Sequence, residues 1–420
     1  MRGEEIRERE GWASRLERRP APTPPRFLPA TPPLPPLVDP PRALASAFRP
    51  LAGPYSSADP SAAATRMRSL AAAGVNGVLI PCRAPTLRTV GGLMETVPVR
   101  DATNGTALRV STTAATAAGL AVGFLSRPYP GRTARTVRDD FLHCAEQARA
   151  ARGGATTPPP VFLVRGAASV PCRHWRFLLT PGSAHSVRTP SNPLSGAWMA
   201  DWAGSGDGDA LAACGFDGGA TPPADDDPEP AVGVPWGARP QQWAGMRAAT
   251  AARGVALVAT VSPGADATAT RPWDRARVRA RQGGARYVRG WRAAAAAGVD
   301  AVLIDSFNGW TGGTQIEEAG GSGAPCAPVR TPTSTAPGPE CAPGGQAYGG
   351  GGGAETAAAV GAAGVPRLYM ALTAVEASRA ARTPPRSSAP VQLQSAEDRV
   401  RSWRGHAGDA EVDEDDDPTP

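Results

Sequence analysis

The sequence predicts an α/β fold with a parallel sheet, because one short pattern recurs along the chain. Residues 71–80 read A-A-A-G-V-N-G-V-L-I, and residues 295–304 nearly repeat them as A-A-A-G-V-D-A-V-L-I. Looser copies lie at 117–125 and 251–260. Each copy combines an alanine-rich helix, a glycine that can cap it and a short apolar strand, which is the second half of a βα unit. This recurrence favours a (β/α)₈ barrel over an all-α or sandwich fold, and the repeat alone also fits a doubly wound sheet.

The composition indicates folded blocks joined by loose segments. Gly contributes 49 and Pro 46 of the 420 residues, and both cluster rather than spread. A chain of this length holds one large barrel or two to three ordinary domains. The net charge is +6, but the arginines are scattered and the C-terminus is acidic. We therefore expect no nucleic-acid partner, since that would need basic residues gathered on one face with aromatic residues between them.

The cysteines and the apolar runs indicate what to expect of metal sites, disulfides and membrane segments. Cysteines 82, 144, 172, 214, 326 and 341 show no C-x-x-C spacing and no neighbouring histidine pair, so we expect no metal site and no cofactor. Cys326 and Cys341 bracket a Gly/Pro-rich loop, and they either pair in an oxidising compartment or remain free thiols. No apolar run reaches the length of a membrane span, and residues 1–20 lack the apolar core of a signal peptide. In the sequence as written we expect neither anchor nor signal peptide.

Both ends of the chain are expected to be disordered. Residues 1–46 are first charged and then dense in proline, which favours extended conformers; the alternative is a ligand for a proline-recognition domain. Residues 383–420 form a polar tail that ends in a run of acidic side chains. Residues 320–355 are rich in Gly and Pro and predict a flexible insertion, because their five-glycine run lacks the lysine of a phosphate loop. The folded domain is therefore predicted to span 47–382.

Local signals place several elements inside that domain. Asp59 is a good N-cap, Pro60 suits the first helical position and Gly74 ends the helix, with a strand expected at 75–80. A further helix is expected from Thr133 to Gly153, and a strand at 161–164.

The chain's clearest candidate site follows the apolar run from Val299 to Ile304. This run has strand length and stops at a polar, glycine-broken segment that holds Asn308, Trp310 and Thr314. A strand of a (β/α)₈ barrel delivers side chains to a site at its carboxyl end in this way.

Residues 306–317 read S-F-N-G-W-T-G-G-T-Q-I-E, which resembles the signature S-F-N-E-W-x-E-G-T-x-I-E of the endo-α-1,2-mannosidase family, glycoside hydrolase family 99. Residues 53–60, 127–132 and 261–274 also look like segments of that family. The resemblance implies a (β/α)₈ TIM-type barrel, which decides against the doubly wound sheet. It also implies a closing strand at 368–373. The family's first strand, rich in Tyr and Trp, should lie within residues 1–46, and we find no such segment there.

The chain departs from the family where the chemistry lies. The resemblance implies two catalytic glutamates three residues apart, and these positions are Gly309 and Gly312 here. A glutamate expected before Pro128 is Arg127, and a tyrosine expected after the strand at 161–164 is Arg165. Asp305 and Glu317 are the nearest substitute carboxylates, and we expect the first to be a strand-end hydrogen bonder and the second to pin the loop.

The candidate glycan-binding residues are Tyr129, Arg271, Asn308 and Trp310. The rings suit sugar stacking, and the arginine and the amide suit hydrogen bonds to hydroxyl groups, although each residue could instead pack or cap.

Three hypotheses follow from these observations. The first is a family 99-like hydrolase barrel that acts on mannose-containing glycans but is catalytically impaired, a pseudoenzyme candidate. The second is a non-catalytic scaffold or interaction protein whose leader and tail make the contacts. The third is an active hydrolase that uses displaced carboxylates. The family's animal members are Golgi-anchored and its bacterial members largely exported, so the resemblance leaves the localisation open, and the sequence does not predict an oligomeric state.

Overall fold

The computed structural model describes residues 48–84, 86–90, 93–97, 105–152, 160–201, 207–223, 237–267, 270, 278–321 and 368–382. The predicted leader and tail, most of the predicted insertion, Arg271, Cys326 and Cys341 lie outside these residues. The limits predicted for the folded domain, 47–382, therefore stay a prediction.

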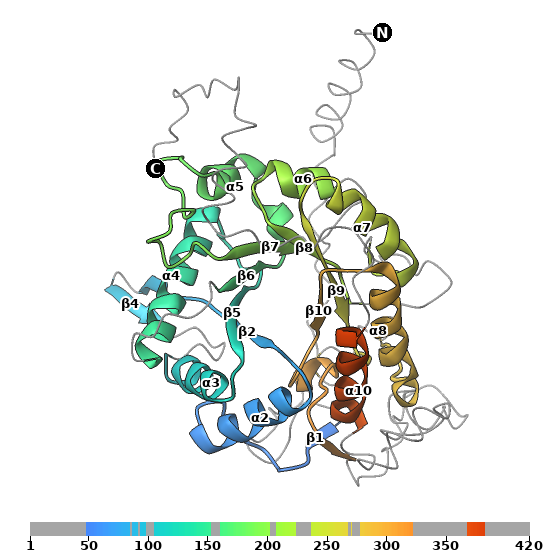
Figure 1. Cartoon of the computed structure of the whole chain (residues 1–420). Coiled ribbons are helices and arrows are strands. Elements are labelled where there is room, and N and C mark those ends of the chain that lie inside the picture. The colour runs from blue at the N-terminus through green and yellow to red at the C-terminus, as the bar shows by residue number, and fades with distance from the viewer. Residues whose placement is uncertain are drawn as a thin grey trace, which may run out of the picture. The chain divides into compact units, whose positions relative to one another are not determined.

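A seven-stranded parallel sheet forms the centre of the fold (Figure 1). Its spatial order is β10-β9-β8-β7-β6-β5-β2, which is the order of the strands along the chain. A doubly wound sheet would reverse its strand order at a switch point, so the structure confirms a barrel-type arrangement. The strands are β2 (Gly77–Pro81), β5 (Ala121–Ser126), β6 (Val161–Val164), β7 (Ala197–Asp201), β8 (Gly218–Ala220), β9 (Ala256–Val261) and β10 (Ala301–Ile304).

The helices flank the curled sheet and connect successive strands (Figure 1). They are α2 (Pro60–Ala72), α3 (Gly105–Ala117), α4 (Ala134–Ala151), α5 (Cys172–Leu179), α6 (Asp207–Ala213), α7 (Trp243–Ala251), α8 (Ala285–Ala297) and α10 (Leu368–Arg382). Short 3₁₀ turns are η1 (Ala167–Ser169), η2 (Pro240–Gln242), η4 (Gln282–Gly284) and η5 (Trp310–Gly312). Two small antiparallel pairs complete the fold: β1 (Phe48–Pro50) with β11 (Ala319–Gly321), and β3 (Thr86–Val90) with β4 (Leu93–Val97).

The structure corrects one element that the resemblance implied. Residues 368–373 are not a closing strand but the first turns of α10, which contacts α8 and α2. The buried side chains of α10 include Leu368, Leu372 and Glu376, which are four residues apart, and also Tyr369 and Thr373, again four apart, which is helical rather than strand spacing. Its alanine content also favours a helix. β11 likewise begins where the flexible insertion was predicted to start.

The barrel lacks one strand among the described residues. β2 and β10 are the two edges of the sheet, and their residues are exposed or half-buried, whereas β5 to β9 are mostly buried. An eighth strand would pair with both edges and close the barrel. This agrees with the failure to find a first strand in the sequence.

Two layers of apolar side chains fill the two faces of the sheet. One layer packs between strands and helices, where the rings of Phe124, Phe141, Phe162 and Trp198 make stacked, tilted and edge-on contacts. The other layer lies on the inner face, and alternate strand residues contribute to it: Leu79, Leu125, Leu163, Met199, Ala220, Val258 and Leu303. Because strand side chains alternate between faces, this inner layer identifies which strand-end residues face the barrel mouth.

Several predicted boundaries agree with the structure. The Asp59 carboxylate accepts hydrogen bonds from the backbone N–H groups of Ser61 and Ala62 at the start of α2, and β6 spans the predicted residues 161–164. Gly74 follows α2 with φ of 78°, a conformation that favours glycine. The helix expected from Thr133 to Gly153 spans Ala134–Ala151, with the Thr133 hydroxyl as its cap.

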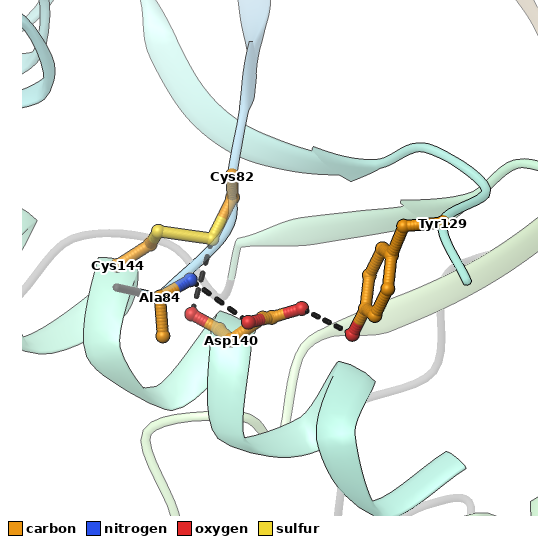
Figure 2. Close-up of a disulfide and its surroundings, with 5 residues drawn as sticks. All are labelled: Cys82, Ala84, Tyr129, Asp140 and Cys144. Atoms are coloured by element: carbon orange, nitrogen blue, oxygen red, sulfur yellow. Dashed lines mark hydrogen bonds between the residues drawn. A yellow bond between two sulfur atoms is a disulfide. The ribbon is translucent and has the colours of Figure 1, made fainter. Parts of the chain in front are cut away.

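Two disulfides join loops and helices around the barrel. Cys82, just after β2, pairs with Cys144 of α4, and Cys172 of α5 pairs with Cys214 beyond α6 (Figure 2 shows the first). Sequence spacing did not reveal either pairing. Among the residues that the structure describes, no helix is both long and apolar enough to cross a membrane.

Candidate functional site

The signature segment 306–317 forms a compact loop at the carboxyl end of β10. The N–H of Ser306 donates to the carbonyl of Thr314 at 3.0 Å, and the N–H of Ile316 donates back to the carbonyl of Ser306 at 3.0 Å. The η5 turn lies between these two bonds. The segment therefore folds back on itself, and both ends of the loop are held near the end of the strand.

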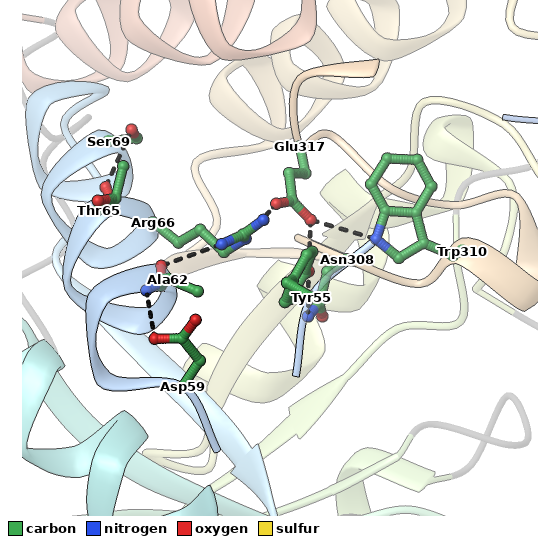
Figure 3. A network of polar contacts seen from close by, with 9 residues as sticks. All are labelled: Tyr55, Asp59, Ala62, Thr65, Arg66, Ser69, Asn308, Trp310 and Glu317. Carbon is green, nitrogen blue, oxygen red and sulfur yellow. Dashed lines mark hydrogen bonds and ion pairs between the residues drawn. The ribbon is translucent and has the colours of Figure 1, made fainter. Parts of the chain in front are cut away.

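Glu317 joins this loop to the N-terminal part of the domain (Figure 3). Its carboxylate accepts a hydrogen bond from the Tyr55 hydroxyl at 2.7 Å and one from the Trp310 indole N–H at 3.2 Å. It also forms an ion pair with Arg66 of α2. The side chains of Glu317 and Arg66 are only 8% and 13% exposed. Burial raises the pKa of the Glu317 carboxyl above its ordinary value, although the hydrogen bond from Tyr55 and the charge of Arg66 oppose this.

Tyr55 and Asn308 extend the same network. The Asn308 amide donates to the Tyr55 hydroxyl at 3.2 Å, and the Arg66 guanidinium lies over the Tyr55 ring, 3.2 Å from its centroid. Burial, with the charge of Glu317 adding to it, raises the pKa of Tyr55. Tyr55 therefore remains a neutral donor to Glu317 at physiological pH.

Arg281 also supports the loop. Its guanidinium donates to the carbonyls of Gly313 at 2.7 Å and Gln315 at 3.0 Å, and it is buried. The N–H of Asp266 also donates to the carbonyl of Gly312 at 2.8 Å, so the loop after β9 contacts the signature loop.

The two glycines at the positions of the family's glutamates have different surroundings. A Cβ on Gly312 would have only Thr314 atoms within 4 Å, at 3.8 Å. A Cβ on Gly309 would overlap the hydroxyl oxygens of Ser306 and Thr314, which bond to each other at 3.0 Å. A side chain at Gly309 thus requires these hydroxyl groups to rotate away, whereas Gly312 has room.

Asp305 lies at the end of β10, two residues beyond the inner-layer residue Leu303. The strand alternation therefore directs Asp305 to the barrel mouth. Its backbone N–H continues the ladder to the carbonyl of Val261 at 2.9 Å, and the side chain is half-buried.

Tyr129 belongs to a second set of contacts, which links the ends of β2 and β5 to α4 (Figure 2). Its hydroxyl donates to Asp140 at 2.6 Å, and the other Asp140 oxygen accepts the N–H of Ala84 at 2.8 Å. The guanidinium of Arg83 lies 4.1 Å from the centroid of the Tyr129 ring. Burial and the bond to Asp140 raise the pKa of Tyr129 to about 12. Cys144, disulfide-bonded to Cys82, follows Asp140 by one helical turn.

Of the four predicted glycan-binding residues, the structure joins two through shared partners. Asn308 and Trp310 both contact the Tyr55–Glu317 pair, while Tyr129 lies with Arg83 and Asp140. Arg271 lies outside the described residues. Among the side chains that the structure describes, no three His, Cys, Asp or Glu residues gather as a metal site would require.

The residues that sequence reasoning missed include Tyr55, Arg66 and Asp140. The family-like segment G-P-Y-S-S-A-D-P contains Tyr55, but its contact with Glu317 spans 262 residues. No local pattern encodes such a partnership. The aspartate and arginine lie on helices whose periodicity indicates only an amphipathic surface.

Comparison with known proteins identifies one protein family and several relatives with related names. The Glycosyl hydrolase family 99 model matches residues 34–325. The human glycoprotein endo-alpha-1,2-mannosidase-like protein is 29% identical over 302 residues, which cover 70% of this chain and 60% of the relative. The Danio rerio protein of the same name is 30% identical over 290 residues, covering 67% and 61%. The chain therefore spans about three fifths of the length of these curated relatives.

A solved structure supports the fold. The GH99 endo-alpha-mannosidase from Bacteroides thetaiotaomicron matches with a TM-score of 0.55 and 23% identity, covering 66% of this chain and 79% of that protein. At this identity the likeness concerns the fold alone. The family match, in contrast, covers more than half of the chain and includes both the Tyr55 segment and the signature loop. The chain belongs to glycosyl hydrolase family 99.

Proposed function

We propose that this chain binds mannose-containing glycans at the carboxyl end of its barrel and hydrolyses them weakly or not at all. Family membership and the names of the relatives, endo-alpha-1,2-mannosidase-like proteins and endo-alpha-1,2-mannosidases, support the substrate class. Parallel-barrel enzymes carry their sites at this end of the sheet.

The observation that carries the proposed impairment is the pair Gly309 and Gly312. Glycoside hydrolysis needs one carboxylic acid to protonate the leaving oxygen and a second carboxylate to act on the other side of the sugar. Glycine supplies neither group, and the signature loop is otherwise folded around these positions. Loss of a general acid or base typically costs roughly 10²- to 10⁴-fold in rate, so the loss of both leaves little turnover.

The substitute carboxylates do not restore this pair. Glu317 already accepts hydrogen bonds from Tyr55 and Trp310 and pairs with Arg66, so its use on a substrate would break the network that holds the loop. Asp305 reaches the mouth from the end of the strand, four residues before Gly309. One carboxylate from Asp305 leaves the second role unfilled.

The decisive experiment compares the natural chain with restored variants on an α-1,2-linked mannose oligosaccharide at high protein concentration. The test variants are Gly312→Glu and the double variant Gly309→Glu/Gly312→Glu. The matched control is Gly309→Gln/Gly312→Gln, which has the same size but no carboxylate. We expect activity from the double Glu variant alone, with circular dichroism used to verify that each variant folds.

Other outcomes separate the competing hypotheses. Turnover by the natural chain that Asp305→Asn abolishes would establish a hydrolase with displaced carboxylates. If the natural chain neither turns over nor binds the oligosaccharide in calorimetry, the glycan proposal is wrong and the scaffold alternative remains. Binding without turnover supports the proposal directly.

A further inference from the structure

Three arginines follow three neighbouring strands at the carboxyl edge of the sheet. Arg83 comes two residues after β2, Arg127 directly after β5 and Arg165 directly after β6. These strands are adjacent, in the order β6-β5-β2. Because parallel strands present their carboxyl ends at one edge, the three residues share one end of the barrel.

The strand register places the arginines in one row. Ser126 is level with Val164, and the N–H of Arg165 donates to the carbonyl of Ser126 at 2.9 Å, which extends the β5–β6 ladder to the arginines. Pro81 is level with Leu125, and the N–H of Cys82 donates to the carbonyl of Leu125 at 2.8 Å. Arg83, Arg127 and Arg165 are therefore next to one another on strands that lie about 4.8 Å apart.

The row faces the barrel mouth. Leu79, Leu125 and Leu163 belong to the inner apolar layer, and side chains on a strand return to the same face every two residues. Arg127 and Arg165 lie two residues beyond their leucines and Arg83 lies four residues beyond Leu79. All three therefore continue the inner face, toward the region where barrel proteins bind ligands.

Two of the three arginines have no hydrogen-bond or ion-pair partner for their side chains among the residues that the structure describes. The side chains of Arg127, which is exposed, and Arg165, which is half-buried, make no hydrogen bond or ion pair with any residue that the structure describes. Arg83 lies over the Tyr129 ring. Like charges on neighbouring strands repel one another, and a bridging anion would relieve that repulsion.

Two aspartates beside the row already have hydrogen-bond partners. Asp201 continues the row on β7, but its two oxygens accept the backbone N–H groups of Gly166 at 2.7 Å and Ala167 at 3.1 Å. Asp140 accepts hydrogen bonds from the Tyr129 hydroxyl and the N–H of Ala84, and burial raises the pKa of its carboxyl, which the charge of Arg83 partly opposes. Neither aspartate forms an ion pair with Arg127 or Arg165.

We propose that Arg83, Arg127 and Arg165 bind an anionic ester group, phosphate or sulfate, on the glycan, so that the site prefers a charged mannoside to a neutral one. The planar guanidinium group donates two parallel hydrogen bonds to such an oxyanion. The resemblance places a glutamate at position 127 in the family, so Arg127 reverses the charge that a neutral sugar would meet there. This inference rests on the proposed glycan binding.

The test measures calorimetric binding of methyl α-mannoside, its 6-phosphate and its 6-sulfate to the full chain, with inorganic phosphate and inorganic sulfate as sugar-free probes. We expect at least about tenfold tighter binding of a charged mannoside than of the neutral one, a preference that falls as salt is raised. A phosphate monoester gains charge near pH 6, so a phosphate preference strengthens from pH 5 to pH 7, whereas a sulfate preference stays constant.

Three variants locate the effect. Arg127→Gln and Arg165→Gln should each remove most of the preference for the charged mannoside and leave the affinity for the neutral one. Arg149→Gln is the matched control, because it removes one positive charge from an exposed arginine in the last turn of α4, at the amino end of the sheet. It should change neither affinity.

Equal binding of neutral and charged mannosides would overturn the inference while the proposed function stands, and so would an Arg149→Gln variant that loses as much preference as Arg127→Gln. Binding of inorganic phosphate or sulfate that depends on Arg127, without binding of any mannoside, would support the anion site and reject the glycan function. The absence of all binding would reject both.

Discussion

The Tyr55 hydroxyl donates a hydrogen bond to Glu317 at 2.7 Å, although 262 residues separate them in the sequence. This bond and the Arg66–Glu317 ion pair connect the segment before α2 to the loop after β10. These two segments flank the sheet edges formed by β2 and β10, where no strand bridges the gap within the described residues. The network therefore joins the first and last parts of the described barrel by side chains.

Replacement of Glu317 by Gln should destabilise the protein by about 3 kcal/mol, because it leaves the Arg66 charge, whose side chain is only 13% exposed, without its carboxylate partner. Urea unfolding measures this loss. In a double-mutant cycle, Arg66→Gln with Glu317→Gln should cost less than the two single changes added together. Glu146→Gln, an exposed site on α4, is the control and should change stability by less than about 0.5 kcal/mol. A similarly small loss for Glu317→Gln would contradict the network's structural role.

The two signature glycines should differ in their tolerance of a side chain. Gly309→Ala should cost about 1 to 3 kcal/mol, since its Cβ would overlap the Ser306 and Thr314 hydroxyl groups. Gly312→Ala should be neutral or slightly stabilising, because the position has room and alanine restricts the unfolded chain. Thermal unfolding of the two variants side by side measures the difference. Equal changes in stability for the two variants would show that the Ser306 and Thr314 hydroxyl groups can move aside at no cost.

Reduction of the disulfides should destabilise the fold. Cys82–Cys144 spans 62 residues and Cys172–Cys214 spans 42, and the chain-entropy model assigns each about 4 kcal/mol. Peptide mapping without reductant should recover both pairs, and dithiothreitol should lower the melting temperature. The double variants Cys82→Ser/Cys144→Ser and Cys172→Ser/Cys214→Ser separate the two contributions. Free thiols at these four positions in the native protein would disprove the pairing.

Stability should fall at alkaline pH as Tyr129 ionises. Burial first, and the bond to Asp140 second, raise its pKa to about 12, compared with about 10 in the unfolded chain. The folded state therefore holds the phenolic proton more tightly, and this contribution is present below pH 10 and is lost as pH rises toward 12. The free energy of unfolding, measured across this pH range, should decline less steeply for Tyr129→Phe than for the natural chain. Part of the decline with pH should remain in this variant, because the pKa of Tyr287 is also raised to about 12. An identical slope in Tyr129→Phe would contradict the assignment.

The sequence predicted the elements whose signals are local. The repeated helix–glycine–strand pattern indicated parallel α/β architecture, Asp59 and Pro60 located the start of α2, and the apolar run at 161–164 defined β6. The signature at 306–317 identified the family through eight matching positions, even with glycines at the two catalytic positions. Such features depend on residues within a few positions of one another, so the chain order alone reveals them.

The tertiary structure decided the features that depend on distant residues. The family resemblance implied a strand at 368–373, but buried side chains of α10 lie four residues apart, where the helix contacts α8 and α2. Glu317 and Tyr55, Cys82 and Cys144, and the arginines at 83, 127 and 165 become neighbours only when the strands take their register. The sequence determines which residues follow each strand. The pairing and packing of the strands determine which of those residues come into contact, and these contacts decide the chemistry at the barrel mouth.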